Sequence, residues 1–289
     1  MIPGPAHPTS HDKPGKLYFL RALIEDPRSA LGPGLVAAAS VAAVLAPLLS
    51  PYAPEAADFV NTLAAPSATH LLGTDDLGRD VLSRIIYGAR VSLFVGLLSV
   101  AMAGVAGTLL GLVAGYFGRA ADALIMRVMD VVFAFPSILL ALAIAAVLGP
   151  SLTNAVLAIA LVNLPVFARV ARAQTLVVRQ LDYVEAKRAL GFGRTNILLR
   201  TMLPNILAPV IVQGSLLFAS AIITESYLSF LGLGVQPPTP SWGNMLRNAI
   251  GFLDLAPWLA WFPGVAIFLT VLGCNLLGDG LRDRFDPRG

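Results

Sequence analysis

Five long stretches of the chain contain no Asp, Glu, Lys or Arg. A helix of about 20 apolar residues crosses a hydrocarbon core of about 30 Å, so each stretch is long enough to span a membrane. The third stretch would extend about 57 Å as one helix, and Gly149-Pro150-Ser151 places a turn signal inside it. The stretches are 29–54, 91–118, 131–168, 201–224 and 255–278. The pattern predicts six membrane-spanning helices, near 31–50, 91–115, 124–148, 152–175, 204–231 and 257–278.

Composition supports this interpretation and excludes other classes of protein. The chain is 56% hydrophobic and only 13% charged, whereas a soluble domain carries about a quarter charged residues. Disordered chains are poor in apolar residues, so they are excluded too. The single cysteine, Cys274, excludes an intramolecular disulfide framework, and three histidines leave little for a histidine metal centre. We therefore expect an all-α polytopic membrane protein, because helices satisfy their backbone hydrogen bonds within lipid.

The basic residues predict the orientation. With both termini in the cytoplasm, sixteen of the twenty Lys and Arg residues fall in cytoplasmic segments, as the positive-inside rule requires. This distribution explains the net charge of +3 without nucleic acid as a partner. The expected organisation is a cytoplasmic tail with an uncleaved interfacial helix (1–30, the helix at 16–25), a first span (31–50), an extracytoplasmic segment (51–90), a membrane core (91–279) with a cytoplasmic loop (176–203), and a cytoplasmic tail (280–289).

Motifs for catalysis are missing from the sequence. The Gly-Lys pair Gly15-Lys16 is followed by Leu17 and lacks the glycine spacing of a phosphate-binding loop. Neither the His-Glu-x-x-His metal motif nor the Gly-x-Ser-x-Gly nucleophile motif occurs. We therefore expect no catalytic residue, no metal site and no ATP hydrolysis by this chain alone.

The loop 176–203 contains a short segment with helix signals at both ends. Asp182 and Glu185 have the spacing of a capping box, and Gly191 predicts a left-handed stop. A helix of about eight residues, roughly 12 Å long, is expected between them, with a narrow Ala186/Ala189 face. Its shape suits a plug in a groove of a partner, but an ordinary basic cytoplasmic loop explains the same residues equally well.

A resemblance favours the plug. The pattern Glu185-Ala186-x4-Gly191, with Pro204 further on, resembles the EAA motif of ABC importer permeases. In that family the short helix docks on the ATP-hydrolysing subunit. The resemblance implies an ATPase-coupling role for Asp182, Glu185, Ala186, Arg188, Ala189, Gly191 and Pro204. This chain departs from the family pattern at Lys187, where alanine is usual, and at Thr201, where isoleucine is usual.

Three further segments narrow the resemblance. Residues 70–93, 229–243 and 275–287 resemble the C-type permeases of dipeptide and oligopeptide importers, a pattern that glutathione and nickel importers share. The similarity extends from about residue 17 to the C-terminus. It implies a type I ABC importer permease fold of six transmembrane helices, with a core of five, in the bacterial cytoplasmic (inner) membrane.

The resemblance also implies partners. They are a homologous B-type permease subunit, two ATP-binding subunits that hold ATP and Mg, and an extracytoplasmic substrate-binding protein, with membrane lipid around the spans. No cofactor is expected in this chain itself.

The extracytoplasmic segment offers candidates for a gate or a binding-protein contact: Gly78, Arg79, Asp80 and Trp242. Gly78 is expected to turn the backbone, while Arg79 and Asp80 either clamp the loop or face the binding protein. A salt-bridged segment is a better explanation of its aspartates than a calcium loop, because the ligand spacing does not fit. Trp242, with Trp258 and Trp261, is expected in an aromatic belt at the membrane interface.

Two acids lie at or within the predicted spans. Glu225 is costly in a membrane and should face the bundle interior. It is either a pathway group facing a cation or a peptide amine, or a structural hydrogen-bonding acid, which we favour. Asp130 is expected to pair with Arg127, three residues before it.

Two other classes of function compete with the importer. A gradient-driven secondary transporter would carry acids or broken helices at the bilayer midplane, where charges are nearly absent here. An intramembrane hydrolase would need a nucleophile and a base within the spans, and no histidine lies in any of them.

Overall fold

The computed structural model describes residues 27–285, so the interfacial helix expected at 16–25 lies outside the described residues. Within that range the chain forms helices and no strand, apart from an isolated bridge between Thr74 and Asp80. The expected all-α fold is therefore confirmed. The helices are α2 (Pro27–Val44), α3 (Ala46–Leu49), α4 (Val81–Phe117), α5 (Arg119–Phe133), α6 (Ser137–Leu148), α7 (Leu152–Val178), α8 (Asp182–Ala189), α9 (Arg194–Asn196), the π-helix η1 (Ile197–Met202), α10 (Leu203–Phe230), α11 (Trp242–Ala249), the 3-10 helix η2 (Ile250–Phe252) and α12 (Trp258–Phe285).

The number of complete spans differs from the expected six. Four helical segments in the described range are long and apolar enough to cross a membrane: Val81–Phe117, Leu152–Val178, Arg194–Phe230 and Trp258–Asp283. The span expected at 124–148 is a pair of helices, α5 and α6, that meet at 90°. The first expected span corresponds to a shorter apolar helix, Ala30–Val44. Pro136, directly before α6, explains the break, because proline lacks the N–H that would continue the helix.

Close packing of α4 on α7 forms the centre of the molecule. Gly107, Gly111 and Gly115 lie on the face of α4 that contacts α7; a Cβ on Gly111 would stand 2.2 Å from the carbonyl oxygen of Ala168. The absence of side chains at these positions lets the two backbones approach, as small residues do between membrane helices. Around this pair, α10 packs on α4, α7 and α12, and α12 packs on α2.

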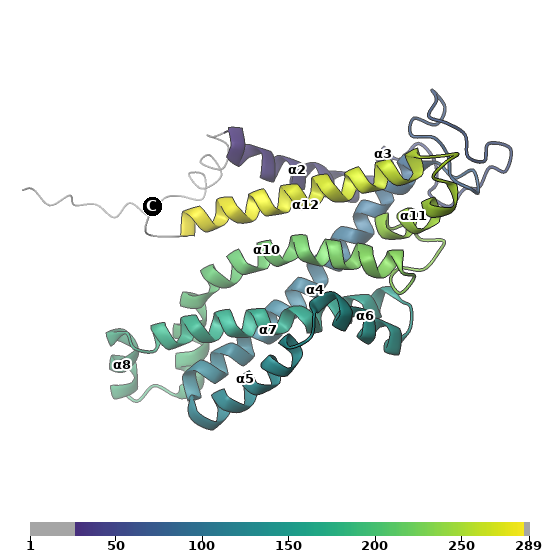
Figure 1. The fold of residues 1–289 in the computed structure, drawn as a ribbon. Coiled ribbons are helices and arrows are strands. Elements are labelled where there is room, and N and C mark those ends of the chain that lie inside the picture. Colours follow the sequence, from purple (N-terminus) through teal and green to yellow (C-terminus); the bar gives the residue numbers. More distant parts are fainter. Residues whose placement is uncertain (1–26, 286–289) are drawn as a thin grey trace, which may run out of the picture.

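The two ends of the helical bundle carry different structures (Figure 1). Figure 1 shows α8 at one end, beside the segment that leads into α10, while the loop 50–80 and α11 lie at the opposite end. The length of α4, α7, α10 and α12 separates the two ends, so the candidate residues fall into two groups at opposite ends of the bundle.

Candidate functional site

The helix α8 lies where the sequence predicts it, but its N-terminus is capped differently. Leu181, with an extended backbone, occupies the N-cap position and no side chain caps the helix, so the expected capping box of Asp182 and Glu185 is wrong. Because α7 ends at Val178 and the amide of Leu181 still bonds to its carbonyl, the cap position falls on Leu181. Asp182 is then the first helical residue, and its negative carboxylate stabilises the helix by interacting with the positive end of the helix dipole.

Gly191, which follows the C-cap residue Leu190, stops α8 as expected with a φ of +77°. The amide of Gly191 donates to the carbonyl of Arg188 at 3.0 Å, and that of Phe192 donates to Lys187 at 3.1 Å. These two bonds form a Schellman motif, which requires a left-handed residue that glycine adopts without steric cost.

Most of α8 is accessible. Val184 is its only buried residue and anchors the helix to the bundle. The residues for which a coupling role is expected are all exposed: Asp182, Glu185, Ala186, Arg188, Ala189, Gly191 and Pro204. Large apolar side chains beside them are exposed too, Tyr183 by 42% and Leu190 by 75%. An exposed helix bordered by apolar side chains is suited to contact with another protein.

Two side chains of α8 connect it to different parts of the bundle. The ammonium group of Lys187 donates to the hydroxyl of Thr201 in η1 at 2.9 Å. The guanidinium of Arg188 lies 5.2 Å from the ring of Tyr116, at the end of α4. The two departures from the family pattern, Lys187 and Thr201, are therefore in contact with each other, which sequence reasoning did not reveal.

A basic cavity beside α8 was also not foreseen. It has a volume of about 480 Å³, and the side chains of Arg179, Arg188 and Arg194 line it. The guanidinium of Arg179 donates to the carbonyl of Gly115 at 3.0 Å, at the end of α4. The three arginines come from the end of α7, from α8 and from α9. In the sequence, the only sign of this cavity is that all three lie in the loop 176–203.

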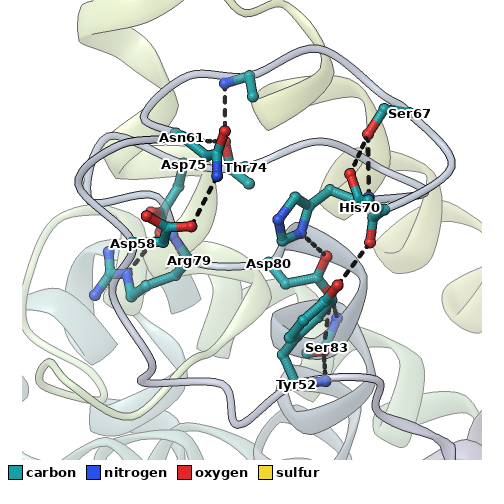
Figure 2. Close-up of polar contacts among 12 residues, drawn as sticks. Tyr52, Asp58, Asn61, Ser67, His70, Thr74, Asp75, Arg79, Asp80 and Ser83 are labelled. Atoms are coloured by element: carbon teal, nitrogen blue, oxygen red, sulfur yellow. Dashed lines mark hydrogen bonds and ion pairs between the residues drawn. The ribbon is translucent and has the colours of Figure 1, made fainter.

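At the opposite end, an ion-pair cluster holds the loop 50–80 (Figure 2). Asp75 accepts from the backbone N–H and from Nε of Arg79, at 2.9 Å and 2.7 Å. Nε of Arg84 lies 3.5 Å from the same carboxylate, and its Nη1 donates to the carbonyl of Pro54. The segment is therefore salt-bridged as expected, and all three side chains of these ion pairs are buried. Within residues 27–285 no group of three or more acidic, cysteine or histidine side chains is placed to hold a metal ion.

Asp80 links the same loop to α4. Its carboxylate accepts hydrogen bonds from the backbone N–H and the hydroxyl of Ser83, so Asp80 is the N-cap of α4. The same carboxylate lies 3.0 Å from Nδ1 of His70 (Figure 2). Asp80 is only 2% exposed and Arg79 6%. Gly78 has a φ of +73° and contacts the backbone of Asp58. These three candidates therefore lie inside the loop, in positions that suit a clamp.

Asp58, at the edge of this loop, is half-buried. The side-chain hydrogen bond from Asn61 holds the pKa of the Asp58 carboxyl below its ordinary value, with the amide of Val60 adding to the effect. Its carboxylate therefore stays ionised and contributes negative charge to the outer surface of the loop.

Trp242 does not belong to an aromatic belt. Its side chain is 2% exposed, packs against Gly88, and donates from Nε1 to the carbonyl of Ile85 at 3.0 Å. Trp261, by contrast, is 71% exposed. The expected belt position is wrong for Trp242 because α11 folds back against α4, which buries the indole and satisfies its N–H within the protein.

Glu225 is fully buried near the same end. Its two carboxylate oxygens accept from the hydroxyls of Ser92 on α4, at 2.9 Å, and Ser229 on α10, at 2.7 Å. The glutamate faces the bundle interior, as its cost in lipid requires. Its contacts fit the structural interpretation that we favour.

Asp130 pairs across helices and not along its own. Nη2 of Arg169 on α7 donates to Asp130 at 2.7 Å, and the Arg169 guanidinium lies 4.0 Å from the ring of Phe133. The expected pair with Arg127 is therefore wrong. The 90° bend after α5 and the packing of α5 on α7 bring the distant arginine closer.

The chain is similar in sequence to known transport permeases. The dipeptide transport system permease protein DppC of Alkalihalophilus pseudofirmus is 45% identical over 293 residues, covering 100% of this chain and 96% of that protein. The di/tripeptide transport system permease DppC of Pseudomonas aeruginosa is 50% identical over 252 residues, covering 85% of this chain and 83% of that protein. The glutathione transport system permease GsiD of Pectobacterium atrosepticum is 49% identical over 231 residues, covering 80% of this chain and 77% of that protein.

The fold is also similar to a solved structure. A chain of the MetNI methionine ABC transporter, in an inward-facing conformation, superimposes with a TM-score of 0.58 at 17% identity, covering 71% of this chain and 98% of that chain. Residues 107–288 match the model of the family described as binding-protein-dependent transport system inner membrane component. With this match and the full-length similarity to DppC, the chain belongs to the family of binding-protein-dependent transport system inner membrane components.

Proposed function

We propose that this chain is the membrane-spanning permease subunit of an ATP-driven importer of dipeptides and oligopeptides. The observation that carries the proposal is the 45% identity to a dipeptide permease over the whole chain. In the proposed complex a homologous B-type permease subunit completes the pathway. Two ATPase subunits hold ATP and Mg at the cytoplasmic face, and a substrate-binding protein delivers peptide from outside. The assembly lies in the bacterial inner membrane, with both termini of this chain in the cytoplasm.

The role proposed for α8 is to dock on an ATPase subunit. Support comes from its single buried anchor, Val184, and from its otherwise accessible surface. When ATP closes the ATPase pair, the docked helices move together and the pathway opens outward; hydrolysis returns it to face inward. The permease contributes two conformations of similar free energy, which its partners bias.

Glutathione is the second candidate cargo, because a glutathione permease is 49% identical to this chain. Uptake of labelled dipeptide, tripeptide and glutathione by cells that express the complete transporter distinguishes the two. Uptake of glutathione without uptake of any dipeptide would overturn the peptide assignment.

Two variants test the docking of α8. Glu185→Lys reverses an exposed charge and places a third cation beside Lys187 and Arg188, which weakens an electrostatically complementary contact. Gly191→Val puts a β-branched residue at φ +77°, which disrupts the Schellman motif at a cost of about 1 kcal/mol. Both should lose peptide uptake and substrate-stimulated ATP hydrolysis while their abundance in the membrane stays near wild type.

Arg282→Glu provides the matched control, because it reverses an exposed charge at the end of α12, outside α8. It should have a much smaller effect. Normal transport by Glu185→Lys at normal abundance would show that α8 is only a basic loop. Purified alone, the chain should show no ATPase activity, and gradient-driven peptide uptake by this chain alone in liposomes would favour a secondary transporter.

A further inference from the structure

The covalent link from α8 back to the membrane helices is poorly suited to transmitting force. It passes through Gly191 and Gly193, and a Cβ at either position would meet no atom within 4 Å. Neither glycine contributes a packed side chain, so backbone hydrogen bonds, such as those of the Schellman motif and that from the amide of Ile197 to the carbonyl of Gly193, shape this link. It lacks the side-chain packing that would carry a load to the membrane helices. A movement of α8 therefore needs another route to reach α10.

The hydrogen bond from Lys187 to Thr201 provides such a route. It spans 14 positions of the sequence at 2.9 Å and bypasses both glycines. The ring of Phe192, in the link after α8, lies 5.9 Å from the same ammonium group. Lys187 is partly buried, whereas the other residues around it on α8, apart from Val184, are exposed. Its side chain thus points back to the bundle and not outward to a partner.

Thr201 receives this contact within a tightly packed region. Its side chain is 4% exposed, and its neighbours Ile197 and Met202 belong to the hydrophobic core. The backbone carbonyl of Thr201 also accepts a hydrogen bond from the side chain of Asn205, in the first turn of α10. A displacement at Thr201 is therefore passed to α10 through packed side chains and a second hydrogen bond.

The element that contains Thr201 is itself unusual. Residues Ile197–Met202 form a π-helix, a rare element that frequently occurs at functional sites. It continues directly into α10, whose second residue is Pro204. The π-helix sets the direction in which α10 enters the bundle, and α10 packs on α4, α7 and α12.

We propose that Lys187 and Thr201 form a strut that transmits the movement of α8 to α10, so that both are positioning residues for the coupling of ATP hydrolysis to transport. This inference rests on the proposed docking of α8 on an ATPase subunit. It adds that docking alone is insufficient: a permease without the strut binds its ATPase subunits and permits hydrolysis, but moves less cargo for each ATP consumed.

The experiment uses the complete transporter, with its partner permease, ATPase subunits and binding protein, in liposomes. Peptide uptake and phosphate release are measured together for Lys187→Met, Thr201→Val and the double variant. Recovery of the ATPase subunits in purification is measured for each. Because a hydrogen bond is worth about 1 kcal/mol, each single variant should reduce the peptide transported per ATP by about fivefold, with ATPase recovery unchanged. The double variant should match the single variants, since the second change removes nothing further.

Two controls separate the strut from general destabilisation. Thr201→Ser retains the hydroxyl and should transport like wild type. Arg200→Met removes an exposed cation from the same π-helix without touching the strut, and should also transport like wild type.

Three outcomes would overturn the proposal. They are a wild-type ratio of transport to hydrolysis in both single variants, additive losses in the double variant, and loss of ATPase subunits from the Lys187→Met complex, which would make Lys187 a docking residue. Failure of the proposed function is recognised separately, because the wild-type assembly would then show no peptide-stimulated hydrolysis at all.

Discussion

Glu225 illustrates how one residue in a span is held by its neighbours. Its carboxylate joins Ser92 of α4 to Ser229 of α10, and none of its surface is exposed. Removing one partner of a buried hydrogen bond costs more than the bond itself contributes, because the remaining polar groups have lost their contact with water. Substitution of Glu225 can therefore distinguish a structural role, in which it holds α4 and α10 together, from a role on the transport pathway.

We expect Glu225→Ala to lower the free energy of unfolding by about 1–3 kcal/mol, because it leaves two buried hydroxyls without an acceptor. Glu225→Gln retains the shape and one acceptor and should cost less. Thermal unfolding in detergent measures both, with Thr224→Ala as control, since that hydroxyl bonds only within its own helix. If Glu225→Ala unfolds like wild type yet does not transport peptide, the pathway interpretation replaces the structural one.

Between elements, the contact of α4 with α7 depends on glycine. Gly107, Gly111 and Gly115 recur every fourth residue and bring three successive turns of α4 against α7. Membrane helices gain little from apolar burial against one another, since lipid is equally apolar, so close van der Waals packing has to hold them together. The spacing of the glycines is visible in the sequence, but the helix that they contact is not.

Gly111→Val should therefore disrupt this contact. A Cβ there would lie 2.2 Å from the carbonyl oxygen of Ala168 and 2.8 Å from the side chain of Ala171, so the helices must separate. Overpacking of this kind costs about 1–3 kcal/mol, and we expect lower abundance in the membrane and a lower unfolding temperature in detergent. Gly264→Ala, in α12 with open space around it, is the control. Equal stability of the two variants would contradict the packing role.

At the scale of the whole molecule, α8 and the loop 50–80 lie at opposite ends of the bundle (Figure 1). The distribution of basic residues predicts that the α8 end is cytoplasmic. Ala68 and Thr195 are both exposed and lie at the two ends.

In a Cys274→Ser background, we expect Ala68→Cys to react with a membrane-impermeant thiol reagent in intact cells. Thr195→Cys should react only after the cells are lysed. Labelling is read by gel shift, and the Cys274→Ser chain without a new cysteine gives the background. Reaction of Thr195→Cys in intact cells would reverse the orientation and exclude docking of α8 on a cytoplasmic ATPase.

Several features follow from the sequence alone. The apolar segments at 91–115, 152–175, 204–231 and 257–278 predict helices that the structure contains, because the partition of a segment between water and lipid depends on its own side chains. The turn at Gly149 and the end of α8 at Gly191 are equally local, since both require a positive φ. The family, too, is recognisable from short motifs in the order of the chain.

Other features depend on the tertiary structure. The pairing of Asp130 with Arg169, the burial of Trp242 and the contact of Lys187 with Thr201 join residues that are distant in the sequence. The π-helix before α10 likewise has no periodic signature. Pro136 marks where the helix breaks after α5, but the 90° angle between α5 and α6 is visible only in the folded chain. Local propensities determine which segments are helical, but the packing of whole helices against one another determines which side chains meet. For that reason the sequence predicts the position of α8, and only the folded chain reveals how α8 is connected to α10.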